Sequence, residues 1–349
     1  MDSLITIVAT VAIFGLVIFI HELGHFLSAK ACGVKVNEFA LGMGPKLISF
    51  GKKETKYSLR LLPIGGYVQM EGEDLDSDDQ RAFFRKPVWN RIIIVAAGAF
   101  MNLVLGFLVV CIMTSVYTKA ISSTTVAQFN EGASTQASGL AVGDKILKIN
   151  DRTVNIARDI TLELQYDEDL VVDMVVLRNG EKVTLQGVKF EYTDAQDEIT
   201  GEAYKKFVID FKVLGIKKTF FSVIRQSFYE SVAIAKMIWT SLGDLITNPQ
   251  LNKISGVVGV GQAIGQAAGL GFEYTLNILA FITINLGIFN LLPIPALDGG
   301  RLLFLIVEAI IRRPVPKKFE GVVHTVGFAI LILLMLVVTF KDIFMLFVR

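Results

Sequence analysis

Four apolar segments of this 349-residue chain are long enough to cross a membrane, and they limit the folds available to it. They cover about residues 4–27, 92–117, 274–292 and 322–340. A run of roughly 18 or more apolar residues is typical of a transmembrane helix. The composition agrees, because 52% of the residues are hydrophobic and 19% are charged, whereas about a quarter are charged in soluble domains. We therefore predict a polytopic α-helical membrane protein with about four transmembrane helices.

A fifth segment, residues 220–246, is apolar but interrupted by charges. Its four charged positions are Arg225, Glu230, Lys236 and Asp244. Charged side chains are costly inside a bilayer, so this pattern favours an amphipathic helix on the membrane surface over a fifth span. No Lys or Arg precedes the first apolar run, and a secretory signal peptide needs such a basic start. We therefore interpret the first run as a membrane span.

Positive charge is concentrated between the first two spans and between the last two. Residues 28–91 carry eleven Lys and Arg, and the short loop expected over residues 298–321 carries five more. Cytoplasmic loops are enriched in these residues, so both loops are predicted to be cytoplasmic. The N-terminus and residues 118–273 then lie on the extracytoplasmic side. The totals of 34 Lys and Arg and 33 Asp and Glu argue against a nucleic-acid partner, because such binding needs a basic excess.

The sequence His21-Glu22-Leu23-Gly24-His25 near the end of the first span indicates a metal site. Residues four apart share one face of a helix, so both imidazoles can point at one ion. Zinc activates a water near neutral pH, and Glu22 is placed to take its proton. Polar caps at a helix end are the alternative interpretation, but they explain this spacing poorly. We predict His21 and His25 as metal ligands and Glu22 as the catalytic base.

A catalytic zinc needs a third protein ligand, for which the sequence offers two candidates. Asp298 follows the third apolar span, and His324 begins the fourth. Helix length places His21 near the cytoplasmic end of its span; Asp298 arrives at a similar depth, and depth alone does not exclude His324. Two prolines and two glycines surround Asp298 and break the helix there, which frees backbone to line a polar cavity. This context favours Asp298.

The H-E-x-x-H motif in the first span, paired with Asn-x-x-Pro-x-Pro-x-Leu-Asp-Gly at residues 290–299, resembles the site-2 proteases. These are intramembrane zinc metalloproteases, and the similarity is greatest to the bacterial sigma-factor-activating branch with one PDZ domain. The resemblance covers nearly the whole chain. It implies a Zn²⁺ cofactor held by His21, His25 and Asp298, a catalytic Glu22, and Asn290 and Pro293 as residues that contact or position substrate.

The cytoplasmic segment 35–70 mixes β-forming residues with glycines, which is typical of short strands and tight turns. It is too apolar for a free loop, and a β-hairpin at the membrane edge fits this composition. A substrate helix must unwind before its backbone can be attacked, and an exposed strand edge could hold the unwound segment. An ordinary cytoplasmic hairpin is the alternative.

Residues 121–192 are predicted to form a separate extracytoplasmic α+β domain. A Gly-Leu-x-x-Gly-Asp-x-Ile-Leu-x-Ile-Asn sequence resembles the signature of bacterial PDZ domains, and Asn179-Gly180 indicates a hairpin turn. Such a domain can bind chain ends by strand addition or act as a steric filter for substrates, and we favour the filter. Residues 193–272 are predicted to hold a linker and the surface helix, and 1–118 and 273–349 the two pairs of spans.

The predicted protein is an intramembrane zinc metalloprotease of a bacterial inner membrane, with its active site near the cytoplasmic side. The resemblance implies a single-span substrate already trimmed by another protease, such as an anti-sigma factor or a remnant signal peptide. One alternative is a membrane-anchored metalloprotease for non-membrane or misfolded proteins. Another is a non-enzymatic metal-binding transporter or PDZ scaffold, although no internal repeat typical of transporters is present.

Overall fold

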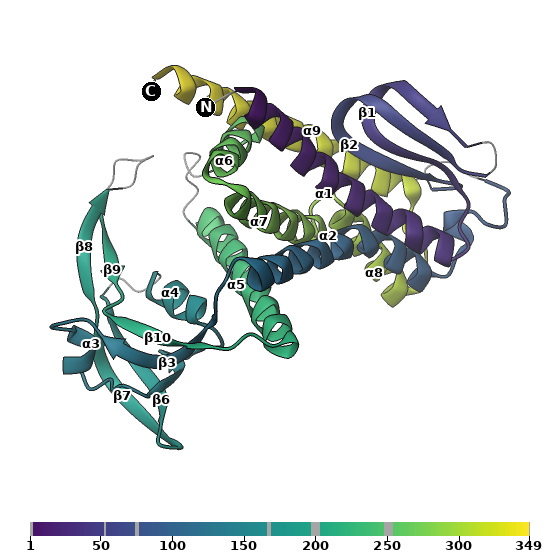
Figure 1. Cartoon of the computed structure of the whole chain (residues 1–349). Coiled ribbons are helices and arrows are strands. Elements are labelled where there is room, and N and C mark those ends of the chain that lie inside the picture. Colours follow the sequence, from purple (N-terminus) through teal and green to yellow (C-terminus); the bar gives the residue numbers. More distant parts are fainter. Residues whose placement is uncertain are drawn as a thin grey trace. The chain divides into compact units, whose positions relative to one another are not determined.

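The computed structural model describes residues 3–51, 54–73, 77–165, 169–196, 203–247 and 254–348 (Figure 1). The chain divides into two compact units, which are described separately. Unit 1 comprises Met1–Val109 with Lys253–Arg349, and unit 2 comprises Val110–Asn252.

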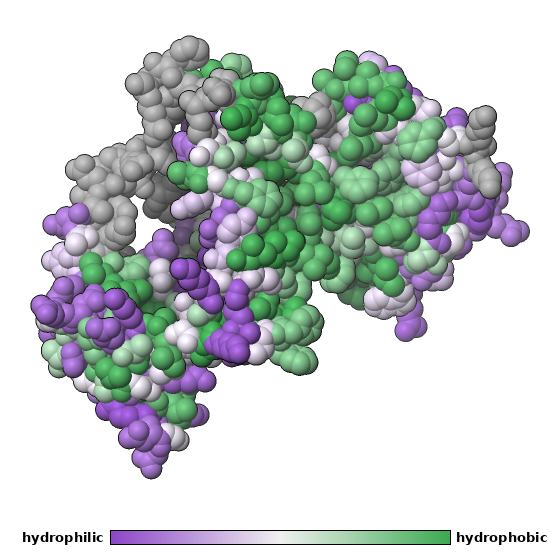
Figure 2. All heavy atoms as spheres, in the orientation of Figure 1, coloured by the Kyte–Doolittle hydropathy of each residue, from purple (hydrophilic) through white to green (hydrophobic). Residues whose placement is uncertain are grey.

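Within the described residues, four helices are long and apolar enough to cross a membrane. They are α1 (Ser3–Ala31), α2 (Val88–Val116), α7 (Phe272–Leu291) and α9 (Lys317–Val348). Large apolar side chains remain exposed along α1 and α9, including Leu4, Val8, Phe328 and Leu333. Figure 2 shows the same hydrophobic surface over unit 1. Such contiguous apolar exposure is stable only against lipid or another protein, so the prediction of a helical membrane protein is confirmed.

Two shorter helices of unit 1 lie outside the predicted spans. α6 (Val257–Leu270) and α8 (Asp298–Ile311) each have 14 residues, fewer than a span requires. The loop expected over residues 298–321 therefore begins with a helix. A β-carbon at Gly265 of α6 would overlap the side chain of Thr6 on α1, so the glycine leaves room for Thr6 where these helices pack together.

Between α1 and α2, unit 1 forms an antiparallel sheet from β1 (Val36–Phe50) and β2 (Lys56–Met70), connected to α2 through the short η1 helix (Phe83–Arg85). Both strands bend, because Gly42, Gly44 and Gly65 adopt positive φ angles. Residue Phe39 consequently pairs with both Val68 and Tyr57. The first half of β1 thus lies between the two halves of β2, and the second half of β2 lies at a sheet edge.

Unit 2 contains a six-stranded sheet in the order β10-β3-β4-β6-β7, with β5 paired to β4. The buried side chains of its core include Val126, Ile146, Ile149, Met174 and Val176. The turn at Asn179-Gly180, with positive φ at both residues, joins β6 to β7. The elements of this part are β3 (Ile121–Phe129), α3 (Ser134–Ala137), β4 (Lys145–Ile149), β5 (Arg152–Thr153), α4 (Ala157–Gln165), β6 (Val171–Arg178), β7 (Glu181–Lys189) and β10 (Phe211–Ile216).

The segment after residue 193, expected from the sequence to be a linker, forms strands instead. β8 (Glu191–Gln196) pairs with β9 (Ala203–Val208), and β10 completes the larger sheet beside β3. Phe211 at the start of β10 is 5% exposed in the core of unit 2, so burial of this ring fixes β10 in the sheet. Residues 220–246, predicted to be helical, lie in α5 (Phe220–Thr247).

Candidate metal centre

Three potential metal donors meet where α1 approaches the start of α8. The Nε2 atoms of His21 and His25 are 3.2 Å apart. Oδ2 of Asp298 lies 3.0 Å from Nε2 of His21 and 3.2 Å from Nε2 of His25. Residues four apart on α1 and a residue far along the chain therefore converge on one point, and these three form the donor cluster found within the described residues.

The backbone of α2 determines which nitrogen of His25 faces the cluster. Nδ1 of His25 lies 2.8 Å from the carbonyl oxygen of Ile94. A carbonyl only accepts hydrogen bonds, so Nδ1 carries the proton and donates. Nε2 is then left with its lone pair directed at the cluster, which is the tautomer that a metal ligand requires.

Two asparagine amides face the outer nitrogen of His21. The side-chain amide of Asn102 on α2 lies 3.3 Å from Nδ1 of His21, and that of Asn290 on α7 lies 3.5 Å from it. Oδ1 of Asn102 is buried and accepts no hydrogen bond from the described residues. An amide can present oxygen instead of nitrogen at nearly the same position. With Oδ1 of Asn102 turned to His21, Nδ1 donates and Nε2 is free to bind a metal.

A tight turn between α7 and α8 directs Asp298 toward the histidines. Ala296 has a φ of 75°, a conformation that costs a non-glycine residue energy. Its N–H donates a hydrogen bond to Nδ1 of His324 at 3.0 Å. β-Carbons at Gly299 and Gly300 would overlap backbone atoms of Leu292 and Ile294. The two glycines and His324 thus permit and stabilise the fold-back that ends at Asp298.

Two glycines, Gly24 on α1 and Gly98 on α2, let these helices pack closely and still leave room for the two imidazoles. A β-carbon at Gly98 of α2 would overlap Nε2 of His25 and lie 2.8 Å from Cε1 of His21. A β-carbon at Gly24 would overlap the backbone oxygen of Ala97. These glycines therefore allow the histidines to lie directly against α2.

The Glu22 carboxylate lies beside the sheet of unit 1. A β-carbon at Gly66 would lie 2.9 Å from Cγ of Glu22, so Glu22 packs against the second half of β2 at Gly66. Glu22 is half-buried. Its carboxylate forms no hydrogen bond and no ion pair with the described residues. It is therefore available to accept a proton.

The donor spacing fits a tetrahedral zinc ion. Donors at about 2.0–2.1 Å from zinc and at tetrahedral angles are about 3.3 Å apart, and the three observed separations are 3.0, 3.2 and 3.2 Å. Oδ2 of Asp298 is also a buried oxygen without a hydrogen-bond donor within the described part of the chain. Two histidines and one carboxylate leave a further coordination position for water or substrate.

The structure brings together five of the six residues singled out from the sequence: His21, His25 and Asp298 in the cluster, Asn290 against His21, and Glu22 next to His21 on α1. Pro293 is exposed in the turn before α8. His324, the alternative third ligand, contacts the backbone of that turn instead. The sequence reasoning missed Asn102, although a polar residue inside an apolar span is a signal of a functional site.

Two histidines one helical turn apart, a facing carboxylate and an adjacent glutamate are residue types that can hold zinc and activate water in a metallopeptidase. Comparison with known families agrees, since residues 9–334 match Peptidase family M50. The chain belongs to this family, and it is a zinc metalloendopeptidase.

Several bacterial proteins are similar over nearly their whole length. A Clostridium acetobutylicum protein assigned provisionally as a zinc metalloprotease is 39% identical, covering 98% of each chain. The zinc metalloprotease RasP of Geobacillus kaustophilus is 31% identical, covering 98% of each chain. The regulator of sigma-W protease RasP of Bacillus subtilis is also 31% identical, covering 98% of this chain and 99% of the relative. These similarities, with the apolar helices, support a bacterial membrane protein.

Proposed function

We propose that this zinc metalloprotease cleaves single-span membrane proteins within their transmembrane segment. The observation that carries the proposal is the position of the donor cluster. His21 and His25 belong to an apolar helix long enough to span a bilayer, and Asp298 follows another such helix after a six-residue turn. A proteolytic centre at this depth has access to the helices of membrane proteins, such as an anti-sigma factor or a remnant signal peptide.

We propose that His21, His25 and Asp298 hold the zinc ion and that Glu22 is the general base. Zinc, when bound, supplies Lewis acidity that activates water and polarises a peptide carbonyl. The free carboxylate of Glu22 accepts a proton from the attacking water and passes it to the leaving amine. Ile94 and Asn102 hold the two imidazoles in the tautomers that ligation requires. Asn290 and Pro293 contact or position the substrate.

The edge of β2 supports a way to present an unwound substrate. Residues 66–70 form the edge of the sheet in unit 1, and Gly66 faces Glu22. A strand edge has unpaired backbone groups that an extended peptide can satisfy. A substrate segment added at this edge would have its carbonyls free of helical hydrogen bonds and close to the proposed base.

The proposed orientation places the N-terminus and unit 2 on the extracytoplasmic side and the active site near the cytoplasm, following the distribution of Lys and Arg. We propose that the sheet of unit 2, which extends beyond residue 192 to β10, is a PDZ domain that limits the size of a substrate's external part. A first protease would then trim the substrate before this enzyme acts.

Co-expression with a tagged single-span protein with a minimal external part tests the proposal. Wild type and His324→Asn are expected to cleave it in membranes, whereas Glu22→Gln and Asp298→Ala are expected to leave it intact. Cleavage that persists with Glu22→Gln would assign the activity to another protease and refute the proposed mechanism.

A further inference from the structure

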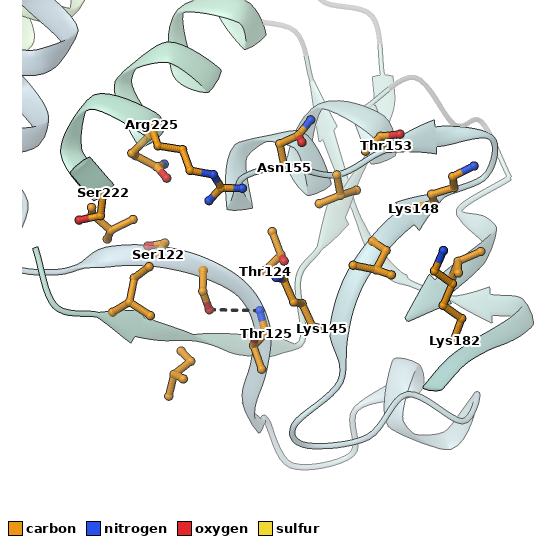
Figure 3. Close-up of a pocket in the computed structure, with 18 residues that line it drawn as sticks. Ser122, Thr124, Thr125, Lys145, Lys148, Thr153, Asn155, Lys182, Ser222 and Arg225 are labelled. Atoms are coloured by element: carbon orange, nitrogen blue, oxygen red, sulfur yellow. Dashed lines mark hydrogen bonds between the residues drawn. The ribbon is translucent and has the colours of Figure 1, made fainter. Parts of the chain in front are cut away.

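Unit 2 contains a cavity of about 490 Å³ that the proposed proteolysis does not use. It is open on one side and is lined by strands of the sheet, among them β3, β4, β7 and β10, and by the first turns of α5 (Figure 3). Four of its lining residues are cationic, namely Lys145, Lys148, Lys182 and Arg225, and its lining includes neither Asp nor Glu. Like charges placed around one cavity repel each other, and a bound anion relieves this repulsion.

The four cations are free to bind an anion. Among the described residues, none of the four forms an ion pair with a carboxylate, although Arg225 also stacks on Tyr229 at 5.2 Å. The nearest acidic side chain on α5, Glu230, is engaged by Arg158 at 2.7 Å and by Gln226 at 3.1 Å. In Figure 3, Arg225 extends from α5 toward the strands.

The remaining lining combines hydroxyl groups with apolar side chains. Thr124, Thr153 and Ser222 contribute hydroxyls, while Ile121, Leu147 and Leu214 contribute apolar surface. Hydroxyls donate hydrogen bonds to phosphate oxygens as readily as to other anions, and the apolar side chains suit the glycerol and upper chain of an amphiphile. The cavity therefore matches an anionic group attached to an apolar molecule.

The cavity also lies where the chain leaves an apolar helix. α2 ends at Val116 and β3 begins at Ile121. The ammonium group of Lys218, just before α5, bonds the carbonyl oxygens of Ser115 and Thr118 at 2.6 and 2.7 Å. These contacts fix the start of α5 to the end of the membrane-spanning helix.

The first turns of α5 present an apolar face beside the cavity. Phe220, Phe221, Ile224 and Phe228 are all exposed, with Phe221 at 82%. By helical spacing these four residues share one face, Arg225 borders it, and Ser222 and Gln226 lie on the opposite side of the helix. Exposed aromatic residues next to cations are typical of a helix at the surface of an anionic membrane.

We propose that this cavity binds the phosphate-bearing headgroup of an anionic phospholipid. The exposed face of α5 would contact the lipid surface, while Arg225 and the strand lysines would bind the phosphate. This inference goes beyond the proposed proteolysis and does not depend on it. The free carboxylate at the end of a peptide is a different ligand with related charge, and the experiment separates the two.

The full chain in neutral detergent would be titrated with phosphatidylglycerol or phosphatidylcholine of identical acyl chains, with bound lipid counted by native mass spectrometry. Wild type should prefer phosphatidylglycerol. Each cation near an anionic lipid contributes to the free energy of binding. Removing two of them in the double variant Lys145→Gln with Arg225→Gln should therefore weaken phosphatidylglycerol binding by about 30-fold. The matched control, Lys189→Gln with Lys212→Gln, removes the same charge from exposed positions outside the cavity and should bind like wild type.

Two competitors identify the ligand. Soluble glycerol phosphate and a peptide with a free carboxyl terminus should both fail to displace phosphatidylglycerol, because neither has the apolar part. Displacement by either one, or equal binding by the cavity variant and its control, would overturn the proposal. Thermal unfolding of both double variants checks that the comparison is made between folded proteins, and Lys148→Gln with Lys182→Gln provides a second cavity variant.

Discussion

At the scale of single residues, the proposed metal ligands and the proposed base face different neighbours within one turn of α1. His21 and His25 point their Nε2 atoms at Oδ2 of Asp298, whereas Glu22 faces Gly66 of β2. Removing a ligand and removing the base should therefore have different consequences. This difference is measurable without knowing the natural substrate.

We predict that Glu22→Gln retains zinc and loses about 10²–10⁴-fold in proteolytic rate, as expected for loss of a general base. Asp298→Ala should lose both zinc and activity, because two histidines alone bind the ion weakly. Elemental analysis of purified variants, beside a cleavage assay, checks this. Zinc retained in Asp298→Ala would contradict the proposed ligand set.

His324 should act by holding the turn that carries Asp298. Its Nδ1 accepts the hydrogen bond from the N–H of Ala296. The oxygen of Asn can occupy the place of Nδ1, whereas the oxygen of Gln corresponds to Nε2. We predict that His324→Leu lowers zinc affinity by about 10–100-fold, the range for groups that support ligands, and that His324→Asn restores most of it. Competition with a zinc chelator measures the affinity; rescue by Gln but not Asn would refute the role.

The sequence predicted the motif residues because the spacing of H-E-x-x-H determines a shared helix face, and because proline and glycine predicted a helix break before Asp298. It could not predict that Asn102 faces His21 or that Ile94 accepts from His25. Both contacts depend on how α2 packs against α1, and spacing along one segment contains no information on that packing.

At the scale of elements, the close approach of α1 and α2 shapes the site. We predict that Gly98→Ala displaces His25, because the added methyl overlaps Nε2, with a loss of zinc and about 1–3 kcal/mol of stability from overpacking. Gly15→Ala is a matched control on α1, since a β-carbon there meets nothing within 4 Å. Equal zinc content and equal thermal unfolding of the two variants would contradict this account.

The sheet of unit 1 depends on a buried carboxylate. Glu38 is 7% exposed and accepts hydrogen bonds from Ser58 at 2.6 Å, from Lys46 and from Arg60. Burial alone would raise the pKa of Glu38, but these three donors outweigh it and lower the pKa to about 2. Because the folded pKa is below the ordinary value of 4.5, the stabilisation is fully present above about pH 4.5 and is lost as the pH falls toward 2.

Glu38→Gln should therefore leave Arg60 and Lys46 without their anion and destabilise the sheet by about 1–3 kcal/mol at neutral pH. Hydrogen exchange of residues 36–70 should become faster, and the difference from wild type should shrink as the pH falls below about 4.5. Ser58→Ala removes one donor and should have a smaller effect. Unchanged exchange in Glu38→Gln would show that this network does not stabilise the sheet.

Element lengths explain what the sequence could and could not predict. The four spans follow from long apolar runs, but α6 and α8 have 14 residues each, and a short apolar run does not distinguish helix from strand or loop. α6 also contains Gly259, Gly261 and Gly265, which weaken a helix in isolation. Its packing on α1 overrides this propensity, and that contact is formed only in the folded protein.

At the scale of the whole molecule, we propose that this zinc protease, whose donor cluster is built into apolar helices, cuts its substrates inside the membrane. The position of the scissile bond in the substrate tests both the proposed orientation of the enzyme and the proposed substrate class. A bond within the substrate's span requires the donor cluster to be accessible from the bilayer. A bond in a flanking segment would instead fit a membrane-anchored protease that acts on chains outside the lipid.

The most direct test is to purify the products of a tagged single-span substrate cleaved in membranes and to determine the new chain ends by mass spectrometry, with Glu22→Gln as the inactive control. We predict one cut within the substrate's apolar span, toward its cytoplasmic end, that is absent with Glu22→Gln. A cut outside the span that requires Glu22 would contradict the claim of intramembrane proteolysis.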